Sequence, residues 1–177
     1  MRGSERGFIL SELLLVIAIA SILALAASMT TVQLLKLTDS NSNHTTSIRD
    51  VQNAGYWISN DTQMAENVTV GTNPETGDFL TIKWTEWGYD GADSKYHTVR
   101  YFLVLRKGVL NLVRDYQITG GINRRAVVAE HIYYNPSDPD RTTVAIYVEP
   151  LLNIQLASSV GDYIEVRKHT AWIRPEF

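Results

Sequence analysis

An unbroken apolar stretch lies near the start of the chain. Between Phe8 and Leu35 the only ionisable side chain is that of Glu12. At a rise of 1.5 Å per residue, a helix over this stretch would be about 42 Å long, which exceeds the roughly 30 Å thickness of the hydrocarbon core of a bilayer. The pattern therefore predicts a membrane-spanning helix. A buried core helix is disfavoured, because a run without a polar face is hard to cover in a domain of this size.

The polar segment that follows, residues 38–46, contains neither Pro nor Gly. Ser, Thr and Asn are mediocre helix formers, so the segment is either the middle of one long helix or a short loop between two helices. From residue 47 the apolar spacing becomes helical and predicts an amphipathic helix that ends near Glu66. Gly55 on its apolar side suggests the close approach of a strand. The predicted buried stripe is Ile48, Val51, Gly55, Ile58 and Ala65. Ala54, Trp57 and Met64 flank this stripe.

Beyond residue 67 the hydrophobic period changes to two residues, which is typical of half-buried strands. Strands are predicted around 80–85 and 99–105, and Arg106-Lys107-Gly108 predicts a turn that joins the second of them to a strand at 109–114. The remaining predicted strands are 127–133, 143–148, 152–157 and 163–173, separated by segments rich in turn residues. These patterns predict an α+β fold, in which a long N-terminal helix packs on a mostly antiparallel β-sheet.

Composition limits the functions that this fold can have. The chain has 177 residues, a formal net charge of −3 and no cysteine. The length suggests one domain after the helix, and the missing cysteines exclude disulfides, thiolate metal sites and a Cys nucleophile. Binding of nucleic acid through phosphates needs clustered Lys and Arg, so no nucleic-acid partner is expected.

We find no catalytic, metal-binding or cofactor-binding constellation. The four histidines lack ligand spacing, and there is no H-E-x-x-H motif, no G-x-S-x-G motif and no glycine-rich phosphate loop. We therefore expect neither enzymatic activity nor a cofactor. The acidic loops at 90–93 and 138–140 could offer oxygen ligands to Ca²⁺, but neither has the EF-hand spacing. A solvated turn is the favoured interpretation of both.

The start of the apolar run differs from that of a secretory signal peptide. In a signal peptide the cleavage site follows the apolar region, whereas here the candidate site, Gly7-Phe8, precedes it. The apolar segment would therefore stay in the mature protein. Glu12 then lies near one end of a membrane helix, where a carboxylate is costly and needs a cationic partner, so it is a candidate functional residue. An ordinary signal anchor explains neither Glu12 nor the Gly-Phe boundary.

These residues resemble the N-terminal signature of type IV prepilins and type II secretion pseudopilins. That signature is a short polar leader ending in Gly, a mature chain that begins with Phe, Glu as its fifth residue, and about twenty apolar residues. Here Gly7 ends the leader, Phe8 would begin the mature chain and Glu12 would be its fifth residue, while Ile9 stands where many members have Thr. The resemblance covers about the first 35 residues. It implies cleavage between Gly7 and Phe8, N-methylation of Phe8 and a role of Glu12 in assembly.

The resemblance also implies an organisation, a location and partners. The chain would comprise a leader at 1–7, a transmembrane and assembly helix at 8–37, the second half of a helical spine at 38–66 and a β-rich periplasmic or extracellular domain at 67–177. It would cross the cytoplasmic (inner) membrane once, with its C-terminal domain outside the cytoplasm, before assembly into a pilus or pseudopilus. Implied partners are membrane lipid before assembly, prepilin peptidase, an inner-membrane assembly platform and other pilins or pseudopilins.

Two features distinguish the chain from major pilins. It lacks their proline about twenty residues into the mature chain, since the first proline is Pro74, and it lacks their C-terminal disulfide. The pattern looks more like the larger minor pseudopilins of the J or W type, which favours a minor, tip-associated subunit. Two alternatives stay open. One is a membrane-anchored binding or sensory domain that does not assemble, and the other is a DNA-uptake pseudopilin, which would need a basic surface.

Overall fold

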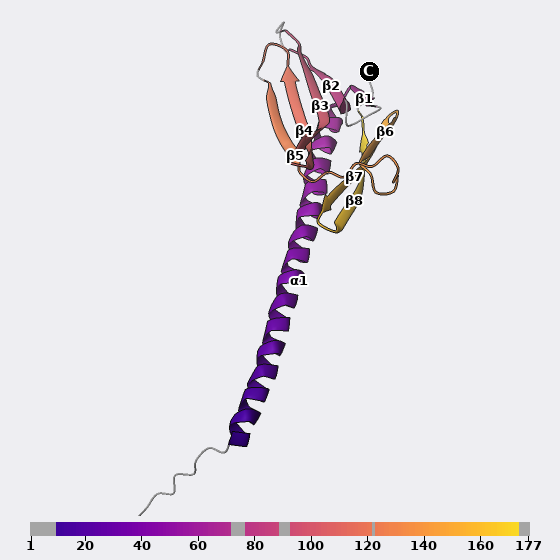
Figure 1. The fold of residues 1–177 in the computed structure, drawn as a ribbon. Coiled ribbons are helices and arrows are strands. Elements are labelled where there is room, and N and C mark those ends of the chain that lie inside the picture. Colours follow the sequence, from indigo (N-terminus) through magenta and orange to yellow (C-terminus); the bar gives the residue numbers. More distant parts are fainter. Residues whose placement is uncertain (1–9, 72–76, 89–92, 122, 174–177) are drawn as a thin grey trace, which may run out of the picture. The chain divides into compact units, whose positions relative to one another are not determined.

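The computed structural model describes residues 10–71, 77–88, 93–121 and 123–173. These residues form one α-helix and eight β-strands (Figure 1). The elements are α1 (Leu10–Met64), β1 (Asn67–Val70), β2 (Asp78–Glu86), β3 (Lys95–Arg106), β4 (Val109–Ile118), β5 (Arg124–Ala129), β6 (Val144–Val148), β7 (Leu151–Val160) and β8 (Tyr163–Trp172). The chain divides into two units, residues 1–42 and residues 43–177.

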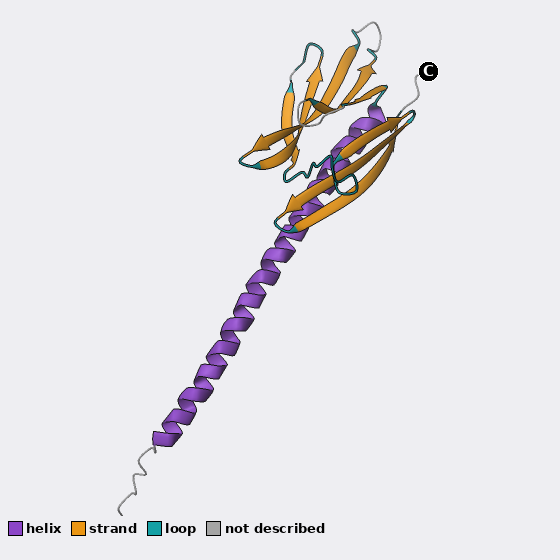
Figure 2. Ribbon diagram, turned by 45° about the vertical axis from the view of Figure 1, so that its right-hand side comes forward, coloured by secondary structure: helices purple, strands orange, loops and turns teal. Residues whose placement is uncertain are grey.

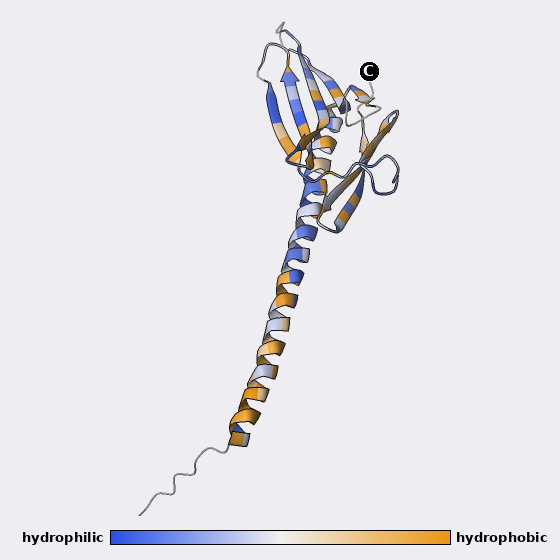
Figure 3. Ribbon diagram, in the orientation of Figure 1, coloured by the Kyte–Doolittle hydropathy of each residue, from blue (hydrophilic) through white to orange (hydrophobic). Residues whose placement is uncertain are grey.

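The first unit holds the apolar part of α1, which appears as the hydrophobic stretch of the helix in Figure 3. All of its described residues are exposed. Five of its Ser and Thr hydroxyls donate hydrogen bonds to the carbonyl four residues earlier, so these five polar groups are satisfied within the helix, as a hydrocarbon environment requires. The hydroxyls are those of Ser21, Ser28, Thr30, Thr31 and Thr38.

Residues 38–46 are helical throughout. The structure therefore contains one continuous helix, which is one of the two possibilities that the sequence left open. Helix α1 ends at Met64, two residues before the predicted end near Glu66. The N–H of Ala65 donates to the carbonyl of Thr62 over 3.1 Å and closes the last turn.

The first sheet has the strand order β1-β2-β3-β4-β5, and all its pairs are antiparallel. The predicted hairpin is confirmed, because Arg106 pairs with Val109 across a two-residue turn. Lys107 and Gly108 have φ angles of 51° and 81°, the left-handed values that such a turn needs. Strand β1 was not predicted.

The second sheet has the order β6-β7-β8 and is also antiparallel. The sequence predicted a single sheet, whereas the structure has two. Figure 2 shows both sheets beside the C-terminal part of α1. The predicted α+β class with a long N-terminal helix and antiparallel pairing is confirmed.

The predicted strand at 127–133 is wrong in its bounds. Strand β5 begins at Arg124 and ends at Ala129, and the chain then changes sheets. His131 has a φ of 55°, a left-handed value that redirects the backbone. Its carbonyl accepts a 2.8 Å hydrogen bond from the N–H of Ser159, and Ile132 forms an isolated bridge with Ser158 of β7. The segment after β5 therefore links the two sheets.

The core of the second unit lies between the C-terminal part of α1 and both sheets. Val51, Ile58 and Ala65 of the predicted stripe are fully buried, but Ile48 is only half-buried and Met64 is 44% exposed. The polar residues Ser47, Asp61 and Thr62 lie on the buried face instead. The largest fully buried side chains include Tyr101, Phe79, Ile58, Leu80, Ile82 and Leu112 with Leu152, Ile154 and Leu156 from the second sheet.

Candidate functional site

The apolar part of α1 is long and apolar enough to cross a membrane. Its side chains leave a continuous apolar surface, with Leu10 73% exposed and Leu23 65% exposed. In a soluble monomer this surface would face water, so it requires lipid or other apolar helices around it. A membrane-spanning helix is therefore supported by length, composition and exposure together.

Glu12 lies in the first turn of α1. Among the described residues of the first unit, the only other ionisable side chains are those of Lys36 and Asp39. Lys36 is 24 positions further along the helix, which corresponds to about 36 Å, so it cannot pair with Glu12. No other described side chain of the first unit can therefore pair with Glu12.

The predicted cleavage position between Gly7 and Phe8 lies outside the described residues, and so does the methylation site Phe8. Cleavage, methylation and the pairing of Glu12 with a new amine remain predictions.

In the second unit, a buried ion pair fastens α1 to the first sheet. Arg114 of β4 donates from Nε and Nη2 to the two carboxylate oxygens of Asp61, each over 2.7 Å. The Asp61 side chain is 1% exposed, and the hydroxyl of Tyr101 also donates to it. Burial, together with the negative charge of Asp61, raises the pKa of Tyr101 far above its usual value, so this hydroxyl stays a donor.

Aromatic rings surround the other side of this ion pair. The Arg114 guanidinium lies 5.0 Å from the ring centroids of both Trp57 and Tyr116, within cation–π range. Tyr116 belongs to a stack with His97 and Trp84, in which the His97 and Trp84 rings are 4.9 Å apart and 6° from parallel. His97 also contacts the Tyr116 hydroxyl through Nδ1 over 2.7 Å. This cluster is built from packed, mutually satisfied groups and leaves no free nucleophile.

A second polar cluster holds the chain where it changes sheets. The Asp50 carboxylate contacts His131 Nδ1 over 3.1 Å and accepts from the Glu130 N–H over 3.3 Å and from the Ser158 hydroxyl over 3.4 Å. Burial raises the pKa of Asp50 despite these partners. The Ser158 hydroxyl donates to Asp50 and not to the histidine, so the three residues do not form a nucleophile–base–acid relay.

Asp50, Glu130 and His131 line an open groove of about 780 Å³ between α1 and the end of β5. Next to the cluster, Asn53 donates from Nδ2 to the carbonyl of Val128 over 2.6 Å. The groove is lined by Thr46, Arg49, Asp50, Gln52, Asn53, Val127, Val128, Ala129, Glu130 and His131. Asp50 and Asn53 thus hold α1 to the end of β5 and to the segment that follows it, and Asp50 also contacts Ser158 of β7, which indicates a structural role.

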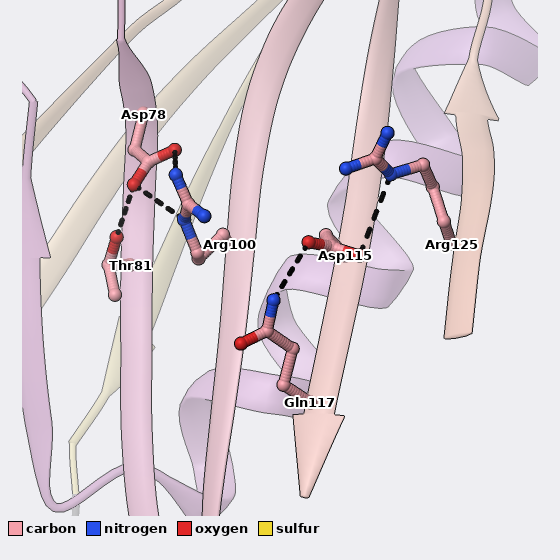
Figure 4. A network of polar contacts seen from close by, with 6 residues as sticks. All are labelled: Asp78, Thr81, Arg100, Asp115, Gln117 and Arg125. Carbon is pink, nitrogen blue, oxygen red and sulfur yellow. Dashed lines mark hydrogen bonds and ion pairs between the residues drawn. The ribbon is translucent and has the colours of Figure 1, made fainter. Parts of the chain in front are cut away.

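The face of the first sheet that points away from α1 carries a row of charges (Figure 4). Arg100 donates to both oxygens of Asp78 over 2.8 and 2.9 Å. Asp115 lies 3.6 Å from Arg125 and accepts from Gln117 over 3.2 Å. Cross-strand pairs of opposite charge stabilise a sheet modestly, and this row has that arrangement.

In the described part of the chain, no group of three or more His, Asp or Glu side chains could hold a metal ion. The loop at 138–140 is shaped by Asn135, which accepts from the N–H of Asp138 and from that of Ser137, both over 3.0 Å. Of the acidic loop at 90–93, only Asp93 is described.

Comparison of the chain with known protein families, with curated proteins and with solved structures finds no match. The N-terminal resemblance therefore rests on the residues that carry it. Sequence reasoning singled out Glu12 but missed Asp50 and Asp61. A carboxylate three positions after the buried Ile58, on the same side of the helix, is the signal that could have revealed Asp61.

Proposed function

We propose that this protein is a structural subunit of a type IV pilus or of a type II secretion pseudopilus. A prepilin peptidase would cut between Gly7 and Phe8, and Phe8 would be N-methylated. The mature chain would wait in the inner membrane with its C-terminal domain outside the cytoplasm. It would then assemble with other pilins or pseudopilins on an inner-membrane platform through its N-terminal helix.

The observation that carries this proposal is the single carboxylate of Glu12 at the start of the apolar, exposed part of α1. A membrane anchor gains nothing from such a charge, which costs a few kcal/mol in hydrocarbon. A helix that must join others in one register gains a polar contact that only the correct register satisfies. Because Lys36 is too far away to serve, a new amine at Phe8 is the nearest cation that the chain itself could supply.

The second unit supports the proposal in a different way. Its polar clusters are occupied by contacts that hold α1 to both sheets, and the groove beside Asp50 contains no catalytic relay. These contacts suit a structural domain. The missing proline and cysteine favour a minor, tip-associated subunit of the J or W type.

The N-terminus of the protein recovered from membranes tests the proposal. Intact-mass analysis should give a chain that begins at Phe8 with one added methyl group. Gly7→Arg should leave the leader attached, because the peptidase must accept a residue without a side chain at the cut. Gly3→Arg makes the same change inside the leader and should be processed normally. If the chain keeps Met1, or if Gly7→Arg is still cut before Phe8, the protein is not a processed pilin-like subunit.

A further inference from the structure

Strand β5 forms an open edge of the first sheet. In the described chain it pairs with β4 on one side and with no strand on the other. Helix α1 covers only the end of this edge. There Asn53 donates a hydrogen bond to the Val128 carbonyl, and Asp50 accepts one from the Glu130 N–H. Residues 124–127 remain exposed. An exposed edge of this kind can pair with an additional strand.

An apolar cleft lies directly beside this open segment, on the sheet face that points away from α1. Its volume is about 250 Å³. Val113 forms a floor that is only 4% exposed, while Val127 of β5 is 38% exposed. The cleft is lined by Phe102, Val104, Arg106, Val113, Arg125, Ala126 and Val127. Its size suits one or two apolar side chains.

Cations border the cleft. The Arg125 guanidinium lies 5.3 Å from the Phe102 ring centroid, and its contact with Asp115 is long, at 3.6 Å. Arg106 has no ion pair among the described residues. Arg124, on β5 itself, adds another positive charge at this edge, in a chain with a net charge of −3. The local charge therefore favours an acidic partner.

We propose that β5 and the neighbouring cleft bind an extended, acidic segment of a protein partner by strand addition. The backbone of that segment pairs with residues 124–127. One of its apolar side chains enters the cleft on Val113, and the flanking carboxylates meet Arg106 and Arg125. In this mode, main-chain hydrogen bonds provide affinity and the side-chain cleft provides sequence preference.

The test uses the full-length protein in detergent and a fluorescent probe peptide, acetyl-Glu-Val-Glu-Leu-Glu-Val-amide, with binding followed by anisotropy. Two matched probes separate the contributions: a version with Lys in place of every Glu, and a version N-methylated at every backbone amide. We expect each to bind at least about ten-fold more weakly, the loss that corresponds to about 1.4 kcal/mol. Hydrogen exchange of the backbone amides in 124–127 should slow when the acidic peptide binds.

Two protein variants provide the complementary test. Arg106→Glu should weaken binding of the acidic peptide by at least about ten-fold. Lys83→Glu makes the same charge change at an exposed position on β2, away from the cleft, and should weaken binding by less than about two-fold. The peptide comparisons need no variant, so they stand even if Arg106→Glu fails to fold.

Several results would overturn the proposal. No binding of the acidic peptide up to about 1 mM would remove the site. Equal losses for Arg106→Glu and Lys83→Glu would mean that only the overall charge attracts the peptide. Undiminished binding of the N-methylated peptide would exclude strand addition.

Discussion

Asp61 of α1 and Arg114 of β4 form a two-pronged ion pair across the core of the second unit, with both hydrogen bonds at 2.7 Å. The two side chains are 1% and 14% exposed. A pair this buried costs much desolvation, so it adds little net stability over an apolar pair. It does fix one register between helix and sheet, because a slipped arrangement would leave both charges buried without a partner.

Asp61→Asn should therefore destabilise the domain strongly. The substitution leaves the Arg114 guanidinium largely buried without a counter-charge, and breaking such pairs typically costs about 3–5 kcal/mol. Urea unfolding of a fragment comprising residues 38–177 would measure the loss. Asp78→Asn removes the same charge from the exposed Asp78–Arg100 pair and should cost at most about 1 kcal/mol. Similar losses for the two variants would contradict the role assigned to Asp61.

Gly55→Ala should also be destabilising, although alanine is the better helix former. A Cβ at residue 55 would overlap Cε1 and Nε2 of His169, which confirms the predicted close approach of a strand. The steric cost of such overpacking is about 1–3 kcal/mol, and it opposes a gain in helix propensity of roughly 0.5–1 kcal/mol. Urea unfolding of the same fragment should show a net loss.

The partner of this contact is tested by a second substitution. In a His169→Ala background the ring is gone, so Gly55→Ala should become neutral or stabilising. A Gly55→Ala loss that persists without the His169 ring would mean that another contact is responsible.

His169 should make the domain less stable in mild acid. Burial, and secondly the charge of Arg167, lower the pKa of His169 below 6.5, and its Nε2 has no hydrogen-bond partner in the described structure. Below pH 6.5 the unfolded chain therefore binds more protons than the folded one, so stability falls as the pH drops from there through the lowered pKa. His169→Gln should reduce the difference between urea midpoints at about pH 8 and pH 5. An unchanged difference would show that other groups cause the pH dependence.

The sequence predicted those parts of the fold that have a local signal. Val51 and Ile58 repeat at helical spacing and are both fully buried. Lys107 and Gly108 suit a two-residue turn, and they form it. The division into two sheets had no such signal, because the chain changes sheets at His131, whose left-handed conformation is uncommon for a residue other than glycine.

The candidate sites were predictable to different degrees. Glu12 stands out because it interrupts an apolar run. Asp50 and Asp61 do not, since a hydrophobicity pattern treats any carboxylate on a helix as exposed. Their partners, His131 and Arg114, lie 81 and 53 residues away in sequence, and only the folded chain brings them together.

Glu12→Val should impair assembly while leaving membrane insertion and cleavage intact. Cleavage before Phe8 would create a positive charge at the end of a membrane helix, where an unpaired charge is costly for the amine and for the carboxylate alike. Glu12 lies four residues after Phe8, so within one subunit it could face its own amine. When helices stagger in a filament, each carboxylate can meet the amine of the next chain. Because unpaired charges are costly to bury, this pairing favours one axial register.

Asp39→Val removes a carboxylate from the same helix beyond the apolar run and serves as the control. Crosslinking to partner subunits should fall for Glu12→Val and not for Asp39→Val, and recovery of both variants in filaments at the unmutated level would rule the pairing out.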